Sequence, residues 1–129
     1  MLNSFSNFAV EMMKPKDITD INRARITAVQ DYIRKHYGEE LKLSELAAVA
    51  NVVPTTLCHI FKNEVGCTVS DFISEVRINR AAEMLLNTDE TVRIIAFECG
   101  YSTLTNFNRQ FKKHMGCTPT EYRERRKKE

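Results

Sequence analysis

The chain contains two similar seven-residue segments, fifty positions apart. Residues 66–72 read GCTVSDF and residues 116–122 read GCTPTEY. In both copies a glycine can end one helix in the left-handed conformation, and a threonine can cap the next helix. An acidic residue three positions after the threonine completes a capping box. The segment therefore predicts a joint between two helices, and its repetition predicts two similar helical units in one chain.

The similarity continues upstream of both joints. SELAAVANVVPTTLCHIFKNEVG aligns with RIIAFECGYSTLTNFNRQFKKHMG when one residue is added to the turn of the second copy. Each copy reads as a short helix, a sharp turn and a second helix. The turn carries Asn51 in the first copy and Gly100 in the second, the residue types that most readily accept a left-handed backbone. This order of elements is typical of a helix-turn-helix.

The outward faces of the second helix in each copy indicate a nucleic-acid ligand. At 100° per residue these faces consist of Thr, Asn, His, Arg and Lys, with Glu64 as their one acidic residue. Such side chains contact base edges and phosphates, whereas an ordinary solvated helix face would mix in Asp and Glu. DNA contact is therefore favoured over an inert face of a helical bundle. The outward residues are Thr55, Thr56, His59, Lys62 and Asn63 in the first copy, and Thr105, Asn106, Arg109, Lys112 and Lys113 in the second.

The stretch between the copies, residues 69–87, predicts one helix of roughly 28 Å. Its apolar residues change from one side of the helix to the other partway along. A helix in a single bundle would keep one apolar stripe along its whole length. The pattern predicts a linker whose two halves pack on different units. Arg77 lies where the apolar residues change side. Two partners for it stay open, an acidic side chain and a DNA phosphate. The first apolar group is Val69, Phe72, Ile73 and Val76, and the second is Ile78, Ala81, Ala82, Leu85 and Leu86.

These segments together resemble the DNA-binding domain of AraC-type transcription regulators. The motifs that carry the resemblance are LSELAAVANVVPTTLCHIFKNEVGCTVSDFISEVRINRAAEMLL and VRIIAFECGYSTLTNFNRQFKKHMGCTPTEYR, within residues 21–126. The resemblance implies an all-α fold of seven helices, with two helix-turn-helix subdomains joined by a long linker helix. It also implies a role in transcription, more often activation than repression. The expected divisions are an N-terminal tail or interdomain linker over 1–20, a first subdomain over 21–68, the linker helix over 69–87, and a second subdomain with a basic C-terminal tail over 88–129.

The resemblance also implies a role for each outward residue. Base-reading residues fall on Thr55, Thr56 and His59 in the first unit, and on Thr105, Asn106 and Arg109 in the second. Phosphate contacts fall on Lys62, Asn63, Ser102, Lys112 and Lys113. His59 is a departure, because this family often has an arginine there, and a neutral imidazole makes a weaker guanine contact than a bidentate guanidinium. The implied partners are double-stranded DNA and RNA polymerase.

Composition and charge agree with such a partner. The net charge of +2 is uneven, since residues 105–129 carry eight Lys and Arg against three Asp and Glu. That asymmetry is compatible with a polyanion. No run approaches the roughly 18 apolar residues of a membrane span, and the N-terminus lacks a signal-peptide pattern, so a cytoplasmic protein without membrane contact is expected. The four cysteines form no C-x-x-C pair, so free thiols are favoured over disulfides or a metal site, and no cofactor is expected.

The same residues bear on three alternative functions: an enzyme, a protein-interaction module and a DNA-repair protein. An enzyme is not expected, because no Gly-rich phosphate loop and no nucleophile with its base stands out. A protein-interaction module stays open. A DNA-repair-type methyl-accepting cysteine on the same fold also stays open, with Cys58 beside His59 as the candidate thiol.

The N-terminal region leaves the extent of the protein open. An amphipathic helix is expected in which Ile26, Val29, Ile33 and Tyr37 share a face. The twenty residues before it include four apolar side chains without an obvious core, which favours a piece of a longer regulator over a small single-domain one. A small-molecule inducer would then bind a sensor domain outside this chain. The four apolar residues are Phe5, Phe8, Val10 and Met12.

Overall fold

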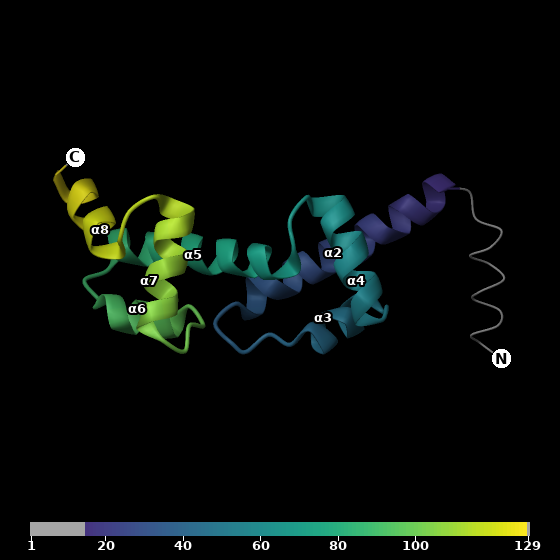
Figure 1. Ribbon diagram of the computed structural model, residues 1–129, viewed down its shortest axis with the longest axis horizontal. Helices are drawn as coiled ribbons and strands as arrows, with labels where there is room; N and C mark the ends of the chain where they lie inside the picture. The colour runs from purple at the N-terminus through teal and green to yellow at the C-terminus, as the bar shows by residue number, and fades with distance from the viewer. Residues whose placement is uncertain (1–14, 129) are drawn as a thin grey trace.

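The computed structural model describes residues 15–128, and within them the chain forms seven α-helices and no strand. Figure 1 shows two helical lobes that lie side by side along the longest axis, with α5 running between them. The expected all-α fold is therefore confirmed. The helices are α2 (Pro15–His36), α3 (Leu43–Ala50), α4 (Pro54–Val65), α5 (Val69–Asn87), α6 (Val92–Glu98), α7 (Leu104–Met115) and α8 (Pro119–Lys128).

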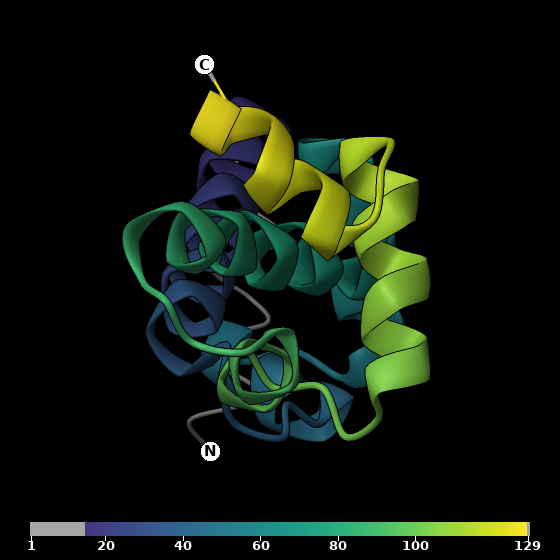
Figure 2. The same cartoon turned by 90° about the vertical axis from the view of Figure 1, so that its left-hand side faces the viewer.

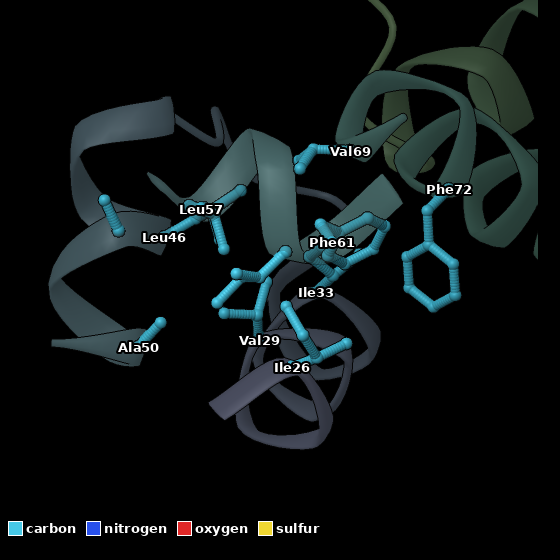
Figure 3. Packing of buried hydrophobic residues seen from close by; sticks show 11 residues of the cluster. Ile26, Val29, Ile33, Leu46, Ala50, Leu57, Phe61, Val69 and Phe72 are labelled. Atoms are coloured by element: carbon cyan, nitrogen blue, oxygen red, sulfur yellow. The ribbon is translucent and has the colours of Figure 1, made fainter. Parts of the chain in front are cut away.

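The first lobe is built on a core from α2, α3, α4 and the first half of α5. Figure 3 shows these side chains converging from all four helices. Phe61 of α4 is fully buried and meets the ring of Phe72 of α5 edge to face, with centroids 5.6 Å apart. Edge-to-face pairs add stability beyond the area they bury. The core comprises Ile26, Val29, Ile33, Leu46, Ala47, Ala50, Leu57, Ile60, Phe61, Val69 and Phe72.

The second lobe repeats this plan with the second half of α5, and with α6, α7 and α8. Its core contains a chain of aromatic rings in which Tyr101 meets Phe107, Phe107 meets Phe111, and Phe111 meets Tyr122 at centroid distances of 5.4, 5.8 and 5.6 Å. Figure 2 views the molecule from the end that carries this lobe. The buried core comprises Ile78, Ala81, Ala82, Leu85, Ile95, Ala96, Cys99, Tyr101, Phe107 and Phe111.

Helix α5 belongs to both lobes, as the change of side in its apolar residues indicated. Val69 and Phe72 lie in the first core, whereas Ile78, Ala81, Ala82 and Leu85 lie in the second. Leu86 was expected with the second group, but its side chain is 45% exposed. One further residue turns it about 100° away from the core-facing Leu85.

The ends of the chain differ from the sequence expectation. Helix α2 begins at Pro15, so six residues assigned to a tail over 1–20 are helical. Helix α2 ends at His36, so Tyr37 lies beyond it and packs on the second core instead of sharing the α2 face. The expected basic tail is helical as α8 through Lys128. The four N-terminal apolar residues Phe5, Phe8, Val10 and Met12 lie outside the described residues.

The repeated heptapeptides form the expected joints. Gly66 and Gly116 follow α4 and α7 with φ of 89° and 80°, where a Cβ would be strained. The Thr68 hydroxyl accepts a hydrogen bond from the main-chain N–H of Asp71 at 3.1 Å. The Thr118 hydroxyl accepts the equivalent bond from Glu121 at 3.2 Å. At each joint only three residues therefore separate the end of one helix from the start of the next.

Each lobe is closed by an arginine from the helix that follows its helix-turn-helix. Arg77 of α5 donates to the main-chain carbonyls of Tyr37 and Glu39 at 2.8 and 2.9 Å, just after α2 ends. Arg123 of α8 donates to the carbonyls of Leu85 and Thr88 at 2.9 and 3.2 Å, where α5 ends. The last carbonyls of a helix have no N–H of a following turn to bind, and a charged donor beside a helix end can satisfy such groups. Within residues 15–128 the hydrogen bonds of Arg77 thus go to main-chain carbonyls, a partner that the sequence analysis did not consider. A DNA phosphate as a further partner of Arg77 stays a prediction.

Candidate nucleic-acid interface

Helix α4 presents a polar face because its apolar residues are held inside the first lobe. Its turn is set by Asn51, which has φ of 56° and ends α3. Pro54 then occupies the first turn of α4 and fixes its start. Leu57 and Phe61 are fully buried, which leaves the opposite face to solvent. The five predicted residues, Thr55, Thr56, His59, Lys62 and Asn63, are all exposed, as are Pro54, Cys58 and Glu64 of the same helix.

Helix α7 presents a corresponding face in the second lobe. The Thr103 hydroxyl accepts from the main-chain N–H of Asn106 at 3.2 Å and caps the helix. Phe107 and Phe111 are fully buried. Of the predicted base-reading residues, Thr105 and Arg109 are exposed, whereas Asn106 is half-buried. The prediction that Asn106 points outward is thus only partly right, because its side chain also lines the space between α7 and α5.

Arg109 is held in place by its neighbour on α7. Its Nη2 donates to Oδ1 of Asn106 at 2.8 Å, one helical turn away. The bond restricts a long side chain and leaves the other guanidinium donors and the Asn106 amide donors for a ligand. In α4 the nearest counterpart is a contact of 3.3 Å between His59 Nε2 and Asn63 Nδ2. Helix α7 therefore offers a bidentate donor in Arg109, which is stronger than the single ring donor that His59 provides on α4.

The charge around the two faces favours an anion. Helix α7 contains no Asp or Glu, and its last turn carries Lys112, Lys113 and His114. The one acidic residue of α4, Glu64, lies 3.8 Å from Arg23 of α2, which offsets its charge. The predicted phosphate contacts Lys62, Asn63, Ser102, Lys112 and Lys113 are all exposed. Figure 1 shows that the helices α4 and α7 both lie on the viewer's side of the molecule.

A polar cavity of about 260 Å³ lies between α5 and α7. From the sequence, Arg77 and Asn106 are singled out for other roles, and Ser70, Ser74, Tyr101 and Gln110 are not identified. Spacing of i and i+4 on one helix face, as in Ser70 and Ser74 or in Asn106 and Gln110, was the signal that could have found them. Burial raises the pKa of the Tyr101 hydroxyl, while Ser74 and Arg77 act in the opposite direction. The polar lining consists of Ser70, Ser74, Arg77, Tyr101, Asn106 and Gln110.

The four cysteines occupy different environments. Cys58 is exposed on α4 among the predicted DNA contacts, Cys67 is half-buried, and Cys99 and Cys117 are buried. Burial raises the pKa of the Cys99 thiol to about 11. Burial and the carboxylates of Asp71 and Glu75 raise the pKa of Cys67. These thiols are therefore weaker nucleophiles at neutral pH than an unperturbed cysteine.

Residues 15–128 contain neither a cluster of metal-ligating side chains nor a single helix that could span a membrane. No group of three or more His, Cys, Asp and Glu side chains is gathered there as a metal ion would require. No single helix in that part of the chain is both long and apolar enough to cross a membrane. The pair α3 and α4 together has such a length and composition, but is bent by 74°.

Comparisons with known proteins agree with a DNA-binding fold of two helix-turn-helix units. A family model described as a helix-turn-helix domain matches residues 46–125. The transcriptional activator RhaR of Mannheimia succiniciproducens is 30% identical over 115 residues, which are 89% of this chain and 41% of that protein. The transcriptional regulator ExsA of Pseudomonas aeruginosa is 31% identical over 107 residues, 83% of this chain and 38% of that protein.

A solved structure extends the comparison to three dimensions. The C-terminal domain of AraT, a response regulator from Geobacillus stearothermophilus, is 35% identical and superposes with a TM-score of 0.74 over 78% of this chain and 84% of that one. The chain belongs to the AraC-type helix-turn-helix family of transcription regulators. It spans about two fifths of the length of the two curated relatives named above.

Proposed function

We propose that the chain binds double-stranded DNA in a sequence-specific way and regulates transcription, as an activator. In this proposal α4 and α7 enter successive major-groove segments on one face of the duplex, as recognition helices of helix-turn-helix proteins do. Activation would require contact with RNA polymerase, which stays a prediction. Any inducer-dependent step would belong to the full-length regulator.

One observation carries the proposal. The helices α4 and α7, which lie on the same side of the molecule, each carry exposed polar residues with almost no acidic residue among them. Because DNA carries one negative charge about every 1.7 Å of its axis, carboxylates on a surface that follows the duplex are repelled by the phosphates, and a scarcity of them favours binding. The only carboxylate of α4 is offset by Arg23. A face that served only for solubility would carry both signs of charge.

The two helices would contribute unequally to sequence specificity. Arg109, braced by Asn106, has the geometry for bidentate contact with the O6 and N7 of a guanine. His59 offers at most one ring donor when neutral. Thr55, Thr56 and Thr105 can contact either a base edge or a thymine methyl group. We expect the subsite under α7 to be the more strongly specified.

Selection of bound sequences from a random duplex pool tests the proposal. The expected outcome is one enriched site of two unlike subsites about one helical turn apart, with affinity that falls steeply as salt rises. Recovery of unenriched sequences would contradict sequence-specific binding. Tight binding to a protein partner together with salt-independent, negligible DNA affinity would favour the protein-interaction module instead.

A further inference from the structure

The two lobes touch at a second place besides the helix that they share. A single helix fixes how far apart two lobes lie, but it can bend, and bending would change the angle between them. The turn after α2, residues 37–39, belongs to the first lobe. It packs on the turn of the second helix-turn-helix, residues 98–101. The two lobes are therefore braced at two points.

Arg77 lies at the centre of this second contact. Its Nε and Nη2 donate to the carbonyls of Tyr37 and Glu39 at 2.8 and 2.9 Å. Its guanidinium carbon also lies 5.7 Å from the ring centroid of Tyr101 in the second lobe, within cation–π range. One side chain thus binds the first lobe through hydrogen bonds and the second lobe through a ring.

Two glycines allow the backbones to approach. A Cβ on Gly38 would lie 2.7 Å from the carbonyl oxygen of Glu98. A Cβ on Gly100 would lie 2.5 Å from the carbonyl oxygen of Tyr37 and 2.8 Å from Nε of Arg77. Gly38 has no positive φ, so the close approach of the lobes is the reason that a larger residue would not be accommodated there.

Tyr37 extends the contact along α5. Its ring packs on the core of the second lobe although the residue follows directly on α2. The guanidinium of Arg80 lies 5.7 Å from the centroid of that ring, and Arg80 Nε donates to the Tyr37 hydroxyl at 3.3 Å. Three different kinds of interaction therefore fix the turn after α2 against the second lobe.

We propose that this inter-lobe clasp, formed by Tyr37, Gly38, Arg77, Gly100 and Tyr101, sets the angle between α4 and α7 and so sets the spacing of the two DNA subsites. Arg77 is then a positioning residue for DNA recognition, which acts through the angle between the lobes. The inference rests on the proposed function, because it assumes that both helices bind one duplex.

The consequence for affinity follows from effective concentration. When the first recognition helix binds, a fixed lobe angle holds the second one at its own subsite. A loosened clasp would spread that lobe over many orientations. Binding to the two-subsite duplex would weaken, whereas binding to one subsite alone would not change.

The chain supplies a matched control for Arg77. Arg123 makes the same pair of hydrogen bonds to two carbonyls at the end of a helix, but both its own helix α8 and its target α5 pack in the second lobe. Arg77→Gln and Arg123→Gln remove equivalent bonds, and only the first touches the clasp. Both variants would be titrated with the selected two-subsite duplex and with duplexes in which one subsite is scrambled.

We expect Arg77→Gln to lose roughly tenfold in affinity for the two-subsite duplex, by the effective-concentration argument, while its affinity for single subsites stays at the wild-type level. Arg123→Gln should keep the wild-type ratio between the two duplexes. An unchanged ratio in Arg77→Gln overturns the clasp. A wild-type protein that gains nothing from the second subsite overturns the proposed function instead.

A measurement without DNA further distinguishes failure of the clasp inference from failure of the proposed function. Residual dipolar couplings of the backbone amides report whether both lobes share one alignment tensor. The wild-type protein should fit one tensor, and Arg77→Gln should require two. Gly38→Ala, which disturbs the contact without removing a charge, should also require two tensors and serves if Arg77→Gln does not fold. A single tensor in a folded clasp variant would refute the inference.

Discussion

At the scale of single residues, the two recognition helices carry different chemistry on the same framework. Arg109 is braced by Asn106 on α7, whereas the matching position of α4 holds His59 beside Asn63. The outward position of Arg109 and His59 could be predicted, because helical periodicity alone decides which residues oppose the buried Leu57 and Phe107. The half-burial of Asn106 could not, because it depends on how α7 packs beside α5.

Substitutions on α7 should separate base reading from phosphate contact. Arg109→Ala should cost roughly 1 to 3 kcal/mol on the selected site and relax specificity at one base position. Lys113→Ala should weaken binding to all sequences alike and lower the salt slope by about one. His59→Ala should cost less than Arg109→Ala. Binding titrations on specific and random duplexes at several salt concentrations measure these effects. Equal losses on both duplexes would remove Arg109 from the base-reading residues.

The thiols should react in the order of their exposure. In the native protein at pH 8, Cys58 should be alkylated first and Cys99 last, as followed by mass spectrometry. With a pKa of about 11 for Cys99, only roughly one thiol in a thousand is ionised at that pH. In denaturant all four should react without added reductant, because all are free thiols. If Cys99 in the native protein were labelled as fast as Cys58, the Cys99 thiol would have to be accessible to solvent, which would contradict its burial.

At the scale of helices, the two helix-turn-helix units differ in how their helices begin. Thr91 and Thr103 cap α6 and α7 with their hydroxyls. The corresponding residues of the first unit, Lys42 and Val53, make no such bond. The joints and the bounds of α5 could be predicted because left-handed glycines and capping threonines are local signals. The start of α2 at Pro15 could not be, since its first turns lack an apolar face that marks them.

An exchange of caps tests the role of these residues. Val53→Thr places a hydroxyl at the start of α4 and should raise the free energy of unfolding by roughly 0.5 to 1 kcal/mol. Thr103→Val removes the bond to the Asn106 N–H and should lower it by about 1 kcal/mol. The two residues have nearly the same shape, so packing changes little. Urea denaturation of both variants beside the wild type provides the values. A loss of stability in Val53→Thr would show that the α4 start has another constraint.

At the scale of the whole molecule, the arrangement of the lobes depends on contacts between distant parts of the chain. The change of side along α5 predicted that each half packs on a different lobe, because apolar residues must face a core. The contact between Gly38 and Glu98 could not be predicted, because the sequence shows only a glycine that could serve any turn. The main-chain carbonyls that accept hydrogen bonds from Arg77 could not be predicted from the sequence either, since every residue has a carbonyl.

The joined lobes should make the protein sensitive to the distance between its two DNA subsites. Helix α5 has 19 residues, which is roughly 28 Å, and successive major-groove segments on one face of a duplex lie about 34 Å apart. Because Arg109 and His59 present different donors, the two subsites should be unlike and the site should not be a palindrome.

Inserting about 5 base pairs between the subsites turns one of them to the far side of the duplex. Inserting about 10 restores the face but doubles a distance that α5 cannot span. Both insertions should therefore reduce the affinity of the wild-type protein to that for a single subsite, measured by titration with duplexes of equal length. A scrambled second subsite at the original spacing supplies that reference value. If the insertion of a full turn instead keeps near-native affinity, the two units are flexibly joined or come from different chains, and α5 does not hold them at one distance.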